Sequence, residues 1–282
     1  MTRLKSSQLS GMNANLTFYD KEFQRKTGIS LSQVAARAAG TSDDDLSHVC
    51  QSELAAVIPI TSGKGVIEGF SRAVNGIIEH MGCPCFVTSE TDVAGLAQSI
   101  EKGASIVFLA DDRRFVAIKL AEGRVVDNTE ATAWGYAHAL DAMIGGMQDR
   151  EVLLIGAGKV GNNAVRALDH LGATVGIFDI NTNKADAVAA KFKAKREFDL
   201  SDALARYTFF FDASPAPAFI LPEHIKPDTA VAACGIPLGL SEEARLRIEE
   251  RLIHDPLQLG VVTMLSMVVL PEKRLKMGGR SE

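Results

Sequence analysis

The residues with the clearest chemical spacing are the glycines of Gly156–Gly161, which read GAGKVG. An apolar run at Val152–Ile155 predicts a buried strand before them, and an apolar helical stripe follows them. In such a unit Gly156 permits a tight turn, Gly158 lets a pyrophosphate approach the backbone, and Gly161 lets the helix pack against the strand. The spacing therefore predicts a dinucleotide-binding turn.

A second apolar strand, at Ala173–Phe178, ends in Asp179. A carboxylate about 20 residues after the glycines can accept hydrogen bonds from the adenine ribose. It also repels a 2′-phosphate, so we expect NAD as the cofactor. The helix start at Lys159 and Val160 supplies N–H groups for the phosphates. The alternative is a βαβ unit that needs its glycines only for packing.

Two later strands, predicted at Tyr207–Phe211 and Ala230–Ala233, end beside this unit. Ligands of open α/β sheets bind at the carboxyl ends of the strands, so we expect the loops that follow to border the ribose and nicotinamide. Simple turn formation is the alternative. The loop residues assigned to the cofactor are Ser214, Pro215, Cys234 and Gly235.

Strands and helices also alternate between Leu54 and Ala110, which predicts a parallel sheet covered by helices. Thr61 and Ser62 follow its first strand, in a glycine-rich segment whose hydroxyl and N–H groups suit a polar or anionic group. A capped turn is the alternative there. Asp111 directly follows the third strand, where a carboxylate can bind a substrate ammonium. Pairing among the acids and arginines of Asp111–Arg114 is the alternative.

The predicted fold class is α/β with two domains. Residues 1–128 form an N-terminal α/β parallel-sheet domain preceded by helices. Residues 129–282 form a linking helix and a C-terminal Rossmann domain with a last helix at Leu257–Leu270, which could pack back across the first domain. Within the first domain we expect a loop at Gly40–Asp45, a helix at Val66–Met81 and a hairpin at Phe115–Asn128.

Composition excludes several classes of function. The 282 residues are 46% hydrophobic with a net charge of −5, and no basic block suggests nucleic acid or a membrane surface. No apolar run reaches the roughly 18 residues of a membrane span, so we expect a cytoplasmic protein. The four cysteines and six histidines lack metal-site spacing, so no metal is expected. Base rates for soluble oligomers favour a homodimer.

The chain combines a TSGxG loop at Thr61–Gly65, an ADDR segment at Ala110–Arg113 and the later GxGxxG at Gly156–Gly161. This combination is far more specific than the glycines alone, and it resembles the pyrrolysine biosynthesis protein PylD family, from Leu4 to Leu270. The chain departs from that family's pattern at Lys64 and in a longer C-terminal tail. The segments that carry the resemblance are Val57–Gly65, Phe86–Thr88 with Asp92-Val93, Ala110–Arg113, Gly156–Gly161, Gly235–Pro237 with Ser241–Glu243, and Pro256-Leu257 with Met264-Leu265.

The resemblance implies the last step of pyrrolysine biosynthesis. An enzyme of this kind is an NAD-dependent amine dehydrogenase that oxidises the terminal amine of 3-methyl-D-ornithyl-N6-L-lysine, releases ammonia and closes the pyrroline ring of L-pyrrolysine. The implied pocket lies between two domains. The resemblance places Ser62 and Asp111 at substrate contacts and Leu4 where the first helix closes over the site, and Thr61 is grouped with them. Asp111 holds the ammonium and then takes a proton, or a water takes it.

Two other functions are compatible with the motifs. One is another two-domain NAD(P)-dependent oxidoreductase acting on a C–N bond, of the methylene-tetrahydrofolate or amino-acid dehydrogenase type. A folate enzyme of that type would keep a lysine base in its first domain, and the context of Lys64 does not suit that role. The other is a non-catalytic NAD-sensing module, against which the polar residues Thr61, Ser62 and Asp111 argue.

Overall fold

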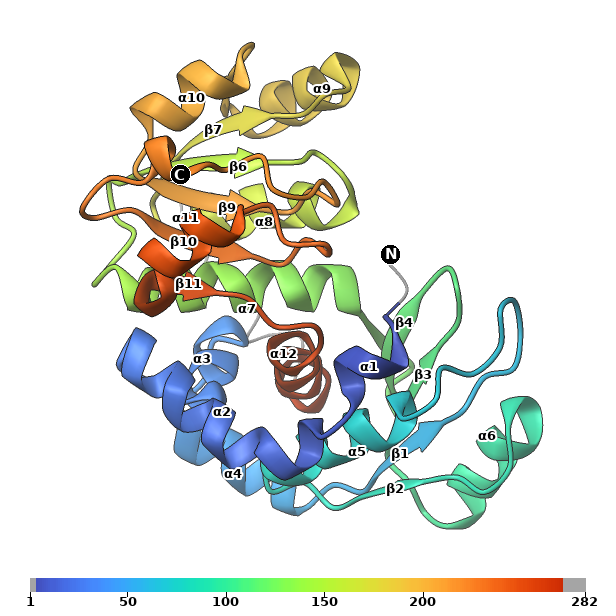
Figure 1. Cartoon of the computed structure of the whole chain (residues 1–282). Helices are drawn as coiled ribbons and strands as arrows, with labels where there is room; N and C mark the ends of the chain where they lie inside the picture. The colour runs from blue at the N-terminus through green and yellow to red at the C-terminus, as the bar shows by residue number, and fades with distance from the viewer. Residues whose placement is uncertain (1–3, 271–282) are drawn as a thin grey trace. The chain divides into compact units, whose positions relative to one another are not determined.

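The computed structural model describes residues 4–270, which form two compact units. The first holds residues 4–22, 30–132 and 257–270, and the second holds residues 23–29 and 133–256 (Figure 1). Both units are α/β, so the predicted fold class is confirmed. None of the helices within residues 4–270 is long and apolar enough to cross a membrane. The longer C-terminal tail, residues 271–282, lies outside the described residues.

The first unit contains a five-stranded mixed sheet in the order β2-β1-β3-β4-β5. Strands β2, β1 and β3 are parallel, as predicted, and the predicted hairpin extends the sheet as antiparallel β4 and β5. The strands are β1 (Ala55–Ile58), β2 (Cys85–Val87), β3 (Ile106–Ala110), β4 (Phe115–Lys119) and β5 (Arg124–Asp127). The helices are α1 (Ser6–Leu9), α2 (Met12–Thr27, whose end belongs to the second unit), α3 (Leu31–Ala38), α4 (Asp43–Gln51), α5 (Phe70–His80), α6 (Asp92–Glu101) and α12 (Gln258–Val269).

Helix α12 is apolar on all sides, and all twelve of its residues are buried. A helix of this kind must be enclosed by other elements, and α12 packs against α3, α4 and α5 and against β4 and β5. It therefore belongs to the first unit. The predicted division into 1–128 and 129–282 grouped it with the dinucleotide unit, and the structure differs because the first unit needs this helix to complete its core.

The loop after β1 is longer than predicted. Helix α5 begins at Phe70 instead of Val66, because the loop contains glycines with positive φ that a helix cannot include. These glycines are Gly63, Gly65 and Gly69, with φ values of 74°, 76° and 83°. Residues 61–69 therefore form an extended loop at the carboxyl end of β1.

The predicted loop Gly40–Asp45 is wrong in its second half, since α4 begins at Asp43. The Ser42 hydroxyl oxygen accepts the Asp45 N–H at 3.1 Å and caps the helix. Three aspartates occupy the first turn, where the helix dipole favours negative charge. The polar segment is therefore the start of a helix.

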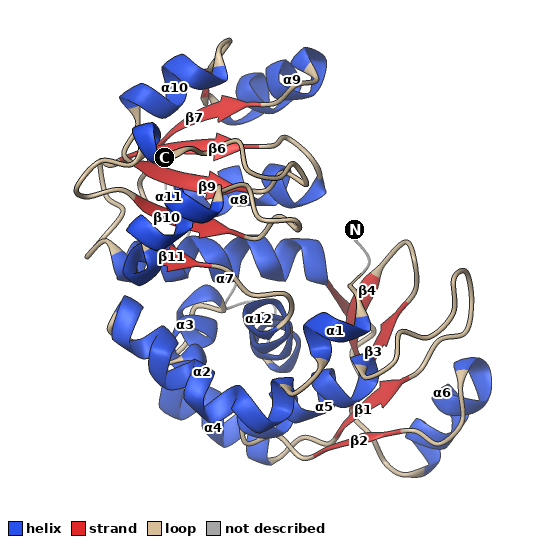
Figure 2. Cartoon of the chain, in the orientation of Figure 1, coloured by secondary structure: helices blue, strands red, loops and turns tan. Residues whose placement is uncertain are grey.

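The second unit contains a six-stranded parallel sheet in the order β11-β10-β9-β6-β7-β8 (Figure 2). This is the strand order of a doubly wound dinucleotide-binding sheet, in which the direction of winding reverses between β6 and β9. The strands are β6 (Glu151–Ile155), β7 (Thr174–Phe178), β8 (Lys195–Arg196), β9 (Phe209–Asp212), β10 (Ala230–Ala233) and β11 (Leu252–Ile253). The helices are α7 (Asn128–Met143, which begins in the first unit), α8 (Lys159–His170), α9 (Thr182–Phe192), α10 (Leu200–Arg206) and α11 (Glu242–Arg247).

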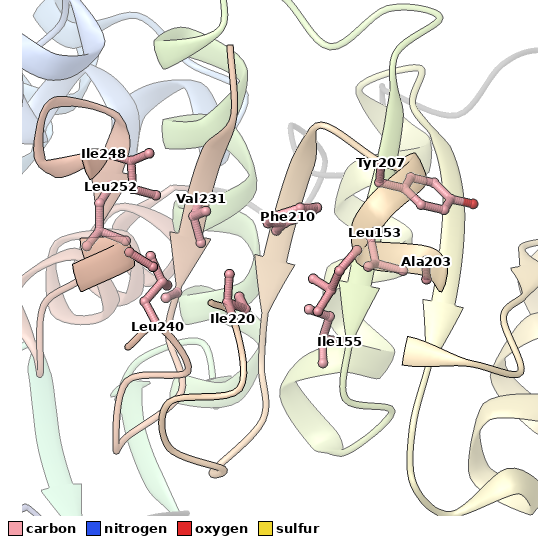
Figure 3. Packing of buried hydrophobic residues seen from close by; sticks show 13 residues of the cluster. Leu153, Ile155, Ala203, Tyr207, Phe210, Ile220, Val231, Leu240, Ile248 and Leu252 are labelled. Carbon is pink, nitrogen blue, oxygen red and sulfur yellow. The ribbon is translucent and has the colours of Figure 1, made fainter. Parts of the chain in front are cut away.

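A buried apolar cluster holds the central strands of this sheet in place (Figure 3). Leu153 and Ile155 of β6 lie in it with Phe210 of β9 and Val231 of β10. These residues fix the ends of β6 and β9, where the glycine turn and its neighbouring loop begin.

Candidate functional site

The glycine turn after β6 is shaped by two of its three glycines. Gly156 has a φ of +100°, and a Cβ there would lie 3.0 Å from the Ala213 carbonyl. A Cβ on Gly161 would lie 1.9 Å from the Gly156 oxygen, so α8 packs directly on the turn. Gly158 differs, because it is exposed and no atom of residues 4–270 lies within 4 Å of its Cβ position. A ligand can therefore approach the backbone at Gly158.

The N-terminus of α8 has no side-chain cap within the described part of the chain. Gly158 is the N-cap residue, and the first turn, which contains Lys159 and Val160, holds no acid. Such a helix start presents unsatisfied N–H donors and a positive dipole end. Together with the exposed Lys159, this arrangement fits the phosphates of a dinucleotide.

Asp179 lies directly on the glycine turn. Its Oδ2 accepts the Ala157 N–H at 2.6 Å, and its Oδ1 accepts the Asn181 N–H at 2.7 Å. The turn and the end of β7 are also joined by a 2.8 Å bond from the Gly156 N–H to the Phe178 carbonyl. Each carboxylate oxygen has a second lone pair, so Asp179 can still accept ribose hydroxyls.

Strand β9 ends in a buried carboxyl group that the sequence analysis did not single out. Asp212 is fully buried, and its Oδ1 accepts the N–H and the hydroxyl of Ser214 at 2.9 and 2.7 Å. Burial raises the pKa of Asp212 to about 6, against the opposing effects of the Ser214 hydrogen bonds, the Gly239 backbone and the charge of His254. The only signal in the sequence is an acid directly after the three phenylalanines of this strand.

The loops after β9 and β10 pack against each other. A Cβ on Gly235 would lie 1.9 Å from the Ser214 carbonyl oxygen. Ser214 and Cys234 are half-buried and Pro215 is exposed. Burial raises the pKa of the Cys234 thiol far above its usual range, so this thiol stays protonated and is no nucleophile. The structure therefore brings all four predicted loop residues together beside the glycine turn.

In the first unit, Thr61 is held by Asp92, the first residue of α6. Asp92 does not cap α6 with its side chain, and its two carboxylate oxygens accept the N–H and the hydroxyl of Thr61. These hydrogen bonds lower the pKa of Asp92. The Thr61 hydroxyl proton is therefore already engaged, and Ser62 beside it is exposed.

Asp111 is exposed and ionised. Its Oδ1 accepts the N–H groups of Arg114 and Arg113, both at 2.7 Å, and these bonds lower the pKa of Asp111. Within residues 4–270 no hydrogen bond is recorded to its Oδ2. The arginine side chains do not pair with it, since Arg114 binds Asp127 with Nε and Oδ2 3.0 Å apart. The acid is therefore held by the backbone, with one oxygen open.

The loops that carry Ser62 and Asp111 are tied together. Strands β1 and β3 are neighbours, so both loops leave the same edge of the sheet. Asp112 joins them, because its Oδ2 accepts the Lys64 N–H at 2.7 Å and lies against Gly63. Neither Asp92 nor Asp112 could be assigned a role from the sequence, since both act by contacts between loops far apart in the chain.

The half-buried Leu4 precedes α1, which packs on the far end of the same loop. The Leu9 Cβ lies 3.8 Å from the Cβ position of Gly69, just before α5. Asn13 continues this contact by donating from Nδ2 to the Arg72 carbonyl at 2.8 Å. The structure therefore places the N-terminal segment next to the loop that contains Thr61 and Ser62, and the contact of Leu4 with substrate stays a prediction.

Comparisons with known proteins agree with this architecture. Residues 8–126 match the model of the pyrrolysine biosynthesis protein PylD N-terminal domain, and residues 132–225 match the alanine dehydrogenase/PNT C-terminal domain. The chain is 29% identical over 270 residues to a pyrrolysine synthase of Methanosarcina barkeri, covering 95% of this chain and 98% of that protein. It is also 29% identical over 275 residues to the pyrrolysine synthase of Methanosarcina acetivorans, covering 95% and 100%.

Solved structures show the same fold. Shikimate dehydrogenase from Aquifex aeolicus matches with a TM-score of 0.53 and 16% identity, covering 81% of this chain and 98% of that one. Another shikimate dehydrogenase, in complex with NADP+, matches with a TM-score of 0.52 and 16% identity, covering 77% and 88%. At this identity the likeness concerns the fold alone.

Proposed function

This chain is a PylD-type pyrrolysine biosynthesis protein, and we propose that it carries out the oxidation that forms pyrrolysine. The proposed substrate is 3-methyl-D-ornithyl-N6-L-lysine and the proposed oxidant is NAD. The substrate loses two hydrogens and ammonia as its ring closes. The product is supported by the two pyrrolysine synthases, each of which matches 95% of this chain.

The observation that carries the proposal is the environment of Asp111. The backbone N–H groups of Arg113 and Arg114 keep this carboxylate ionised while its second oxygen stays open at the end of β3. An exposed, permanently charged carboxylate at this edge of a sheet suits a cationic group. The terminal ammonium of the proposed substrate is such a group.

The lowered pKa of Asp111 suits this residue to binding the ammonium better than to removing its proton. A carboxylate with a lowered pKa is a weak base, and its charge favours the protonated form of a bound amine. Asp111 therefore binds and orients the ammonium. The proton that must leave before oxidation goes to water, or to Asp111 at the moment when the amine loses its charge. Ser62 and Leu4, on the segments beside Asp111, are proposed to contact the rest of the substrate.

The dinucleotide would be held by the glycine turn. Gly158, Lys159 and Val160 bind the pyrophosphate, and Asp179 binds the adenine ribose. NAD, when bound, accepts a hydride from the carbon that bears the amine. Asp179 favours NAD over NADP because its charge repels a 2′-phosphate. One of the structurally similar shikimate dehydrogenases is in complex with NADP+, so the fold itself does not select NAD. The proposed preference of this chain for NAD over NADP therefore rests on Asp179.

Ring closure requires few contributions from protein side chains. Oxidation leaves a carbon–nitrogen double bond at the former amine carbon, and the ornithyl α-amine of the same molecule then attacks that carbon and displaces ammonia. The ring that forms has five members, so the step is intramolecular and favoured by proximity. The protein has only to fold the substrate and limit the access of water.

The proposal is tested by incubating the full chain with NAD and synthetic 3-methyl-D-ornithyl-N6-L-lysine. We expect reduced nicotinamide to form together with a product lighter by ammonia and two hydrogens. Free lysine and free 3-methyl-D-ornithine serve as matched substrates that lack one part. If NAD is reduced only with those amines, the protein is a dehydrogenase that acts on another substrate. If NAD binds but no amine reduces it, the enzymatic proposal is overturned.

A further inference from the structure

Asp212 lies at the point of the second sheet where dinucleotides bind. It ends β9, which is paired with β6, the strand that leads into the glycine turn. The winding of a doubly wound sheet reverses between these two strands, and the crevice at their carboxyl ends is the usual cofactor site. A fully buried acid is uncommon at any position.

Asp212 holds both loops beside that crevice. Its side chain binds the N–H and the hydroxyl of Ser214, and its main-chain carbonyl accepts the N–H groups of Cys234 at 3.0 Å and Gly235 at 3.2 Å. The intervening Ala213 lies against Gly156, and its backbone is fixed there because its N–H donates to the Ile155 carbonyl at 2.9 Å. One residue therefore connects both loops to the glycine turn.

One oxygen of the carboxyl group lacks a well-formed hydrogen bond. Asp212 Oδ2 is buried against Gly239, whose backbone favours the charged form of the acid, but no hydrogen bond of normal geometry reaches Oδ2 from the described residues. A buried oxygen of this kind is destabilising, and such a group in a native structure needs an explanation. Packing alone does not supply one, because an apolar side chain would fill the same space without this loss.

We propose that Asp212 is a positioning residue for the nicotinamide half of the dinucleotide: its ionised side chain holds Ser214, and its main-chain carbonyl holds the Cys234–Gly235 backbone. The charged carboxylate strengthens both bonds to Ser214, and protonation weakens them. The charge of Asp212 therefore sets the position of the Ser214 loop, against which Gly235 packs, and with it the affinity for the dinucleotide. This inference depends on the proposed function in one respect, namely that the bound dinucleotide is NAD.

The other titratable groups near Asp212 are few. His254, after β11, favours the charged form of Asp212, and its Nδ1 lies 2.8 Å from the Ala233 carbonyl oxygen. Cys234 stays protonated because burial raises the pKa of its thiol, and the negative charges of Asp212 and Asp255 raise this pKa further. A dependence of binding on pH near the pKa of about 6 is therefore assigned to Asp212, with His254 as the group to be controlled.

The test is the dissociation constant of NADH, measured by fluorescence with the full chain from about pH 5 to about pH 8, a range that spans the titration of Asp212. We expect the affinity of the wild type to fall as the pH drops through the pKa of about 6. Asp212→Asn should bind about tenfold more weakly at neutral pH, since charge-assisted hydrogen bonds become neutral ones, and its profile should be flat. His254→Gln should keep a dependence on pH.

Asp199→Asn is the matched control. Asp199 is an exposed acid that caps α10 by accepting the Asp202 N–H at 2.9 Å, so its neutralisation changes the net charge equally and should leave NADH binding unchanged. If Asp212→Asn does not fold, Ser214→Ala removes one of the two hydrogen bonds while the acid stays in place, and its binding should be weaker than that of the wild type.

Wild-type affinity in Asp212→Asn, or a pH profile of this variant that still falls as in the wild type, would overturn the inference. Where Asp212→Asn is unfolded, wild-type affinity in Ser214→Ala would overturn it. Failure of the proposed function looks different. In that case the wild type binds NADH with the expected dependence on Asp212 but does not oxidise the amine. A wild type that does not bind NADH would overturn both.

Discussion

Asp179 and Ala157 are joined by a hydrogen bond of 2.6 Å, in which the Ala157 N–H donates to the Asp179 carboxylate across 22 residues of the chain. The bond fixes the acid at the end of β7 on the turn that follows β6. The carboxylate is thereby positioned before any ligand arrives, and its contribution to cofactor choice can be separated from its contribution to the turn.

Replacing Asp179 by Asn keeps an acceptor for the Ala157 N–H and removes the charge. We expect NADH to bind about tenfold more weakly and the preference over NADPH to shrink, because a 2′-phosphate no longer meets a negative charge. Dissociation constants for both dinucleotides provide the measurement. An unchanged ratio between them would mean that Asp179 does not select NAD.

Gly158 and Gly161 make a matched pair, since alanine at each adds the same methyl group. At Gly161 the methyl would lie 1.9 Å from the Gly156 oxygen, so Gly161→Ala should lower the free energy of unfolding by about 3 kcal/mol. At Gly158 the methyl meets open space, so Gly158→Ala should fold as the wild type does but bind NADH at least about tenfold more weakly. Chemical denaturation and NADH titration distinguish the two. If Gly158→Ala binds NADH as tightly as the wild type does, the pyrophosphate does not approach the backbone at Gly158.

Asp111→Asn tests the ammonium-binding role. We expect kcat/KM for the amine to fall about a hundredfold, since a charged partner is replaced by a neutral one, with NADH affinity unchanged. Glu101→Gln, which neutralises an exposed acid at the end of α6, is the control and should retain activity. Undiminished turnover by Asp111→Asn would show that this carboxylate does not hold the substrate.

The buried Asp212 should make the protein less stable as the pH rises. Its pKa is raised from 3.8 to about 6 on folding, so between these values the folded protein keeps a proton that the unfolded chain has lost. Stability is therefore lost as the pH increases through this window, by about 3 kcal/mol in full above pH 6 and by roughly half of that at pH 5. Asp212→Asn has no such group.

The difference in unfolding free energy between the wild type and Asp212→Asn should therefore shift in favour of the variant between about pH 5 and about pH 8. Denaturant titrations of both proteins at each pH give this difference, and the other titrating groups cancel. A difference that stays constant with pH would show that Asp212 is ionised in the folded state throughout.

Helix α12 offers a test of the core of the first unit. Leu265 is fully buried at its centre, so Leu265→Ala should lower the free energy of unfolding by about 3 kcal/mol through lost burial and the cavity left behind. Val93, which is 82% exposed on α6, provides the control, because Val93→Ala should change stability by less than about 0.5 kcal/mol. Equal effects of the two substitutions would contradict the enclosed position of α12.

The sequence was most informative where a local pattern carries the physical cause. The glycine spacing, the strand before it and Asp179 after it are each local, and they predict the doubly wound unit that the structure contains. Helix α4 was missed because three aspartates resemble a loop until the Ser42 cap is recognised. The start of α5 was placed too early, since the φ of Gly69 cannot be obtained from the periodicity of the apolar residues.

The roles of single acids were less predictable. Asp92 and Asp212 both occupy positions near element ends, where an acid usually caps a helix or faces water. Their partners, Thr61 and Ser214, are identified only once the loops are folded. The enclosure of α12 is a similar case, because its apolar sequence shows that it is buried but not which elements bury it.

The most direct test of the central claim follows the atoms of the reaction. The substrate is prepared with deuterium on the carbon that bears the terminal amine and with nitrogen-15 in that amine, and is incubated with the protein and NAD. The account predicts that deuterium appears in the reduced cofactor and that the nitrogen-15 leaves as ammonia while unlabelled nitrogen remains in the ring. Retention of the nitrogen-15 in the ring, or a reduced cofactor without deuterium, would contradict oxidation at the terminal amine.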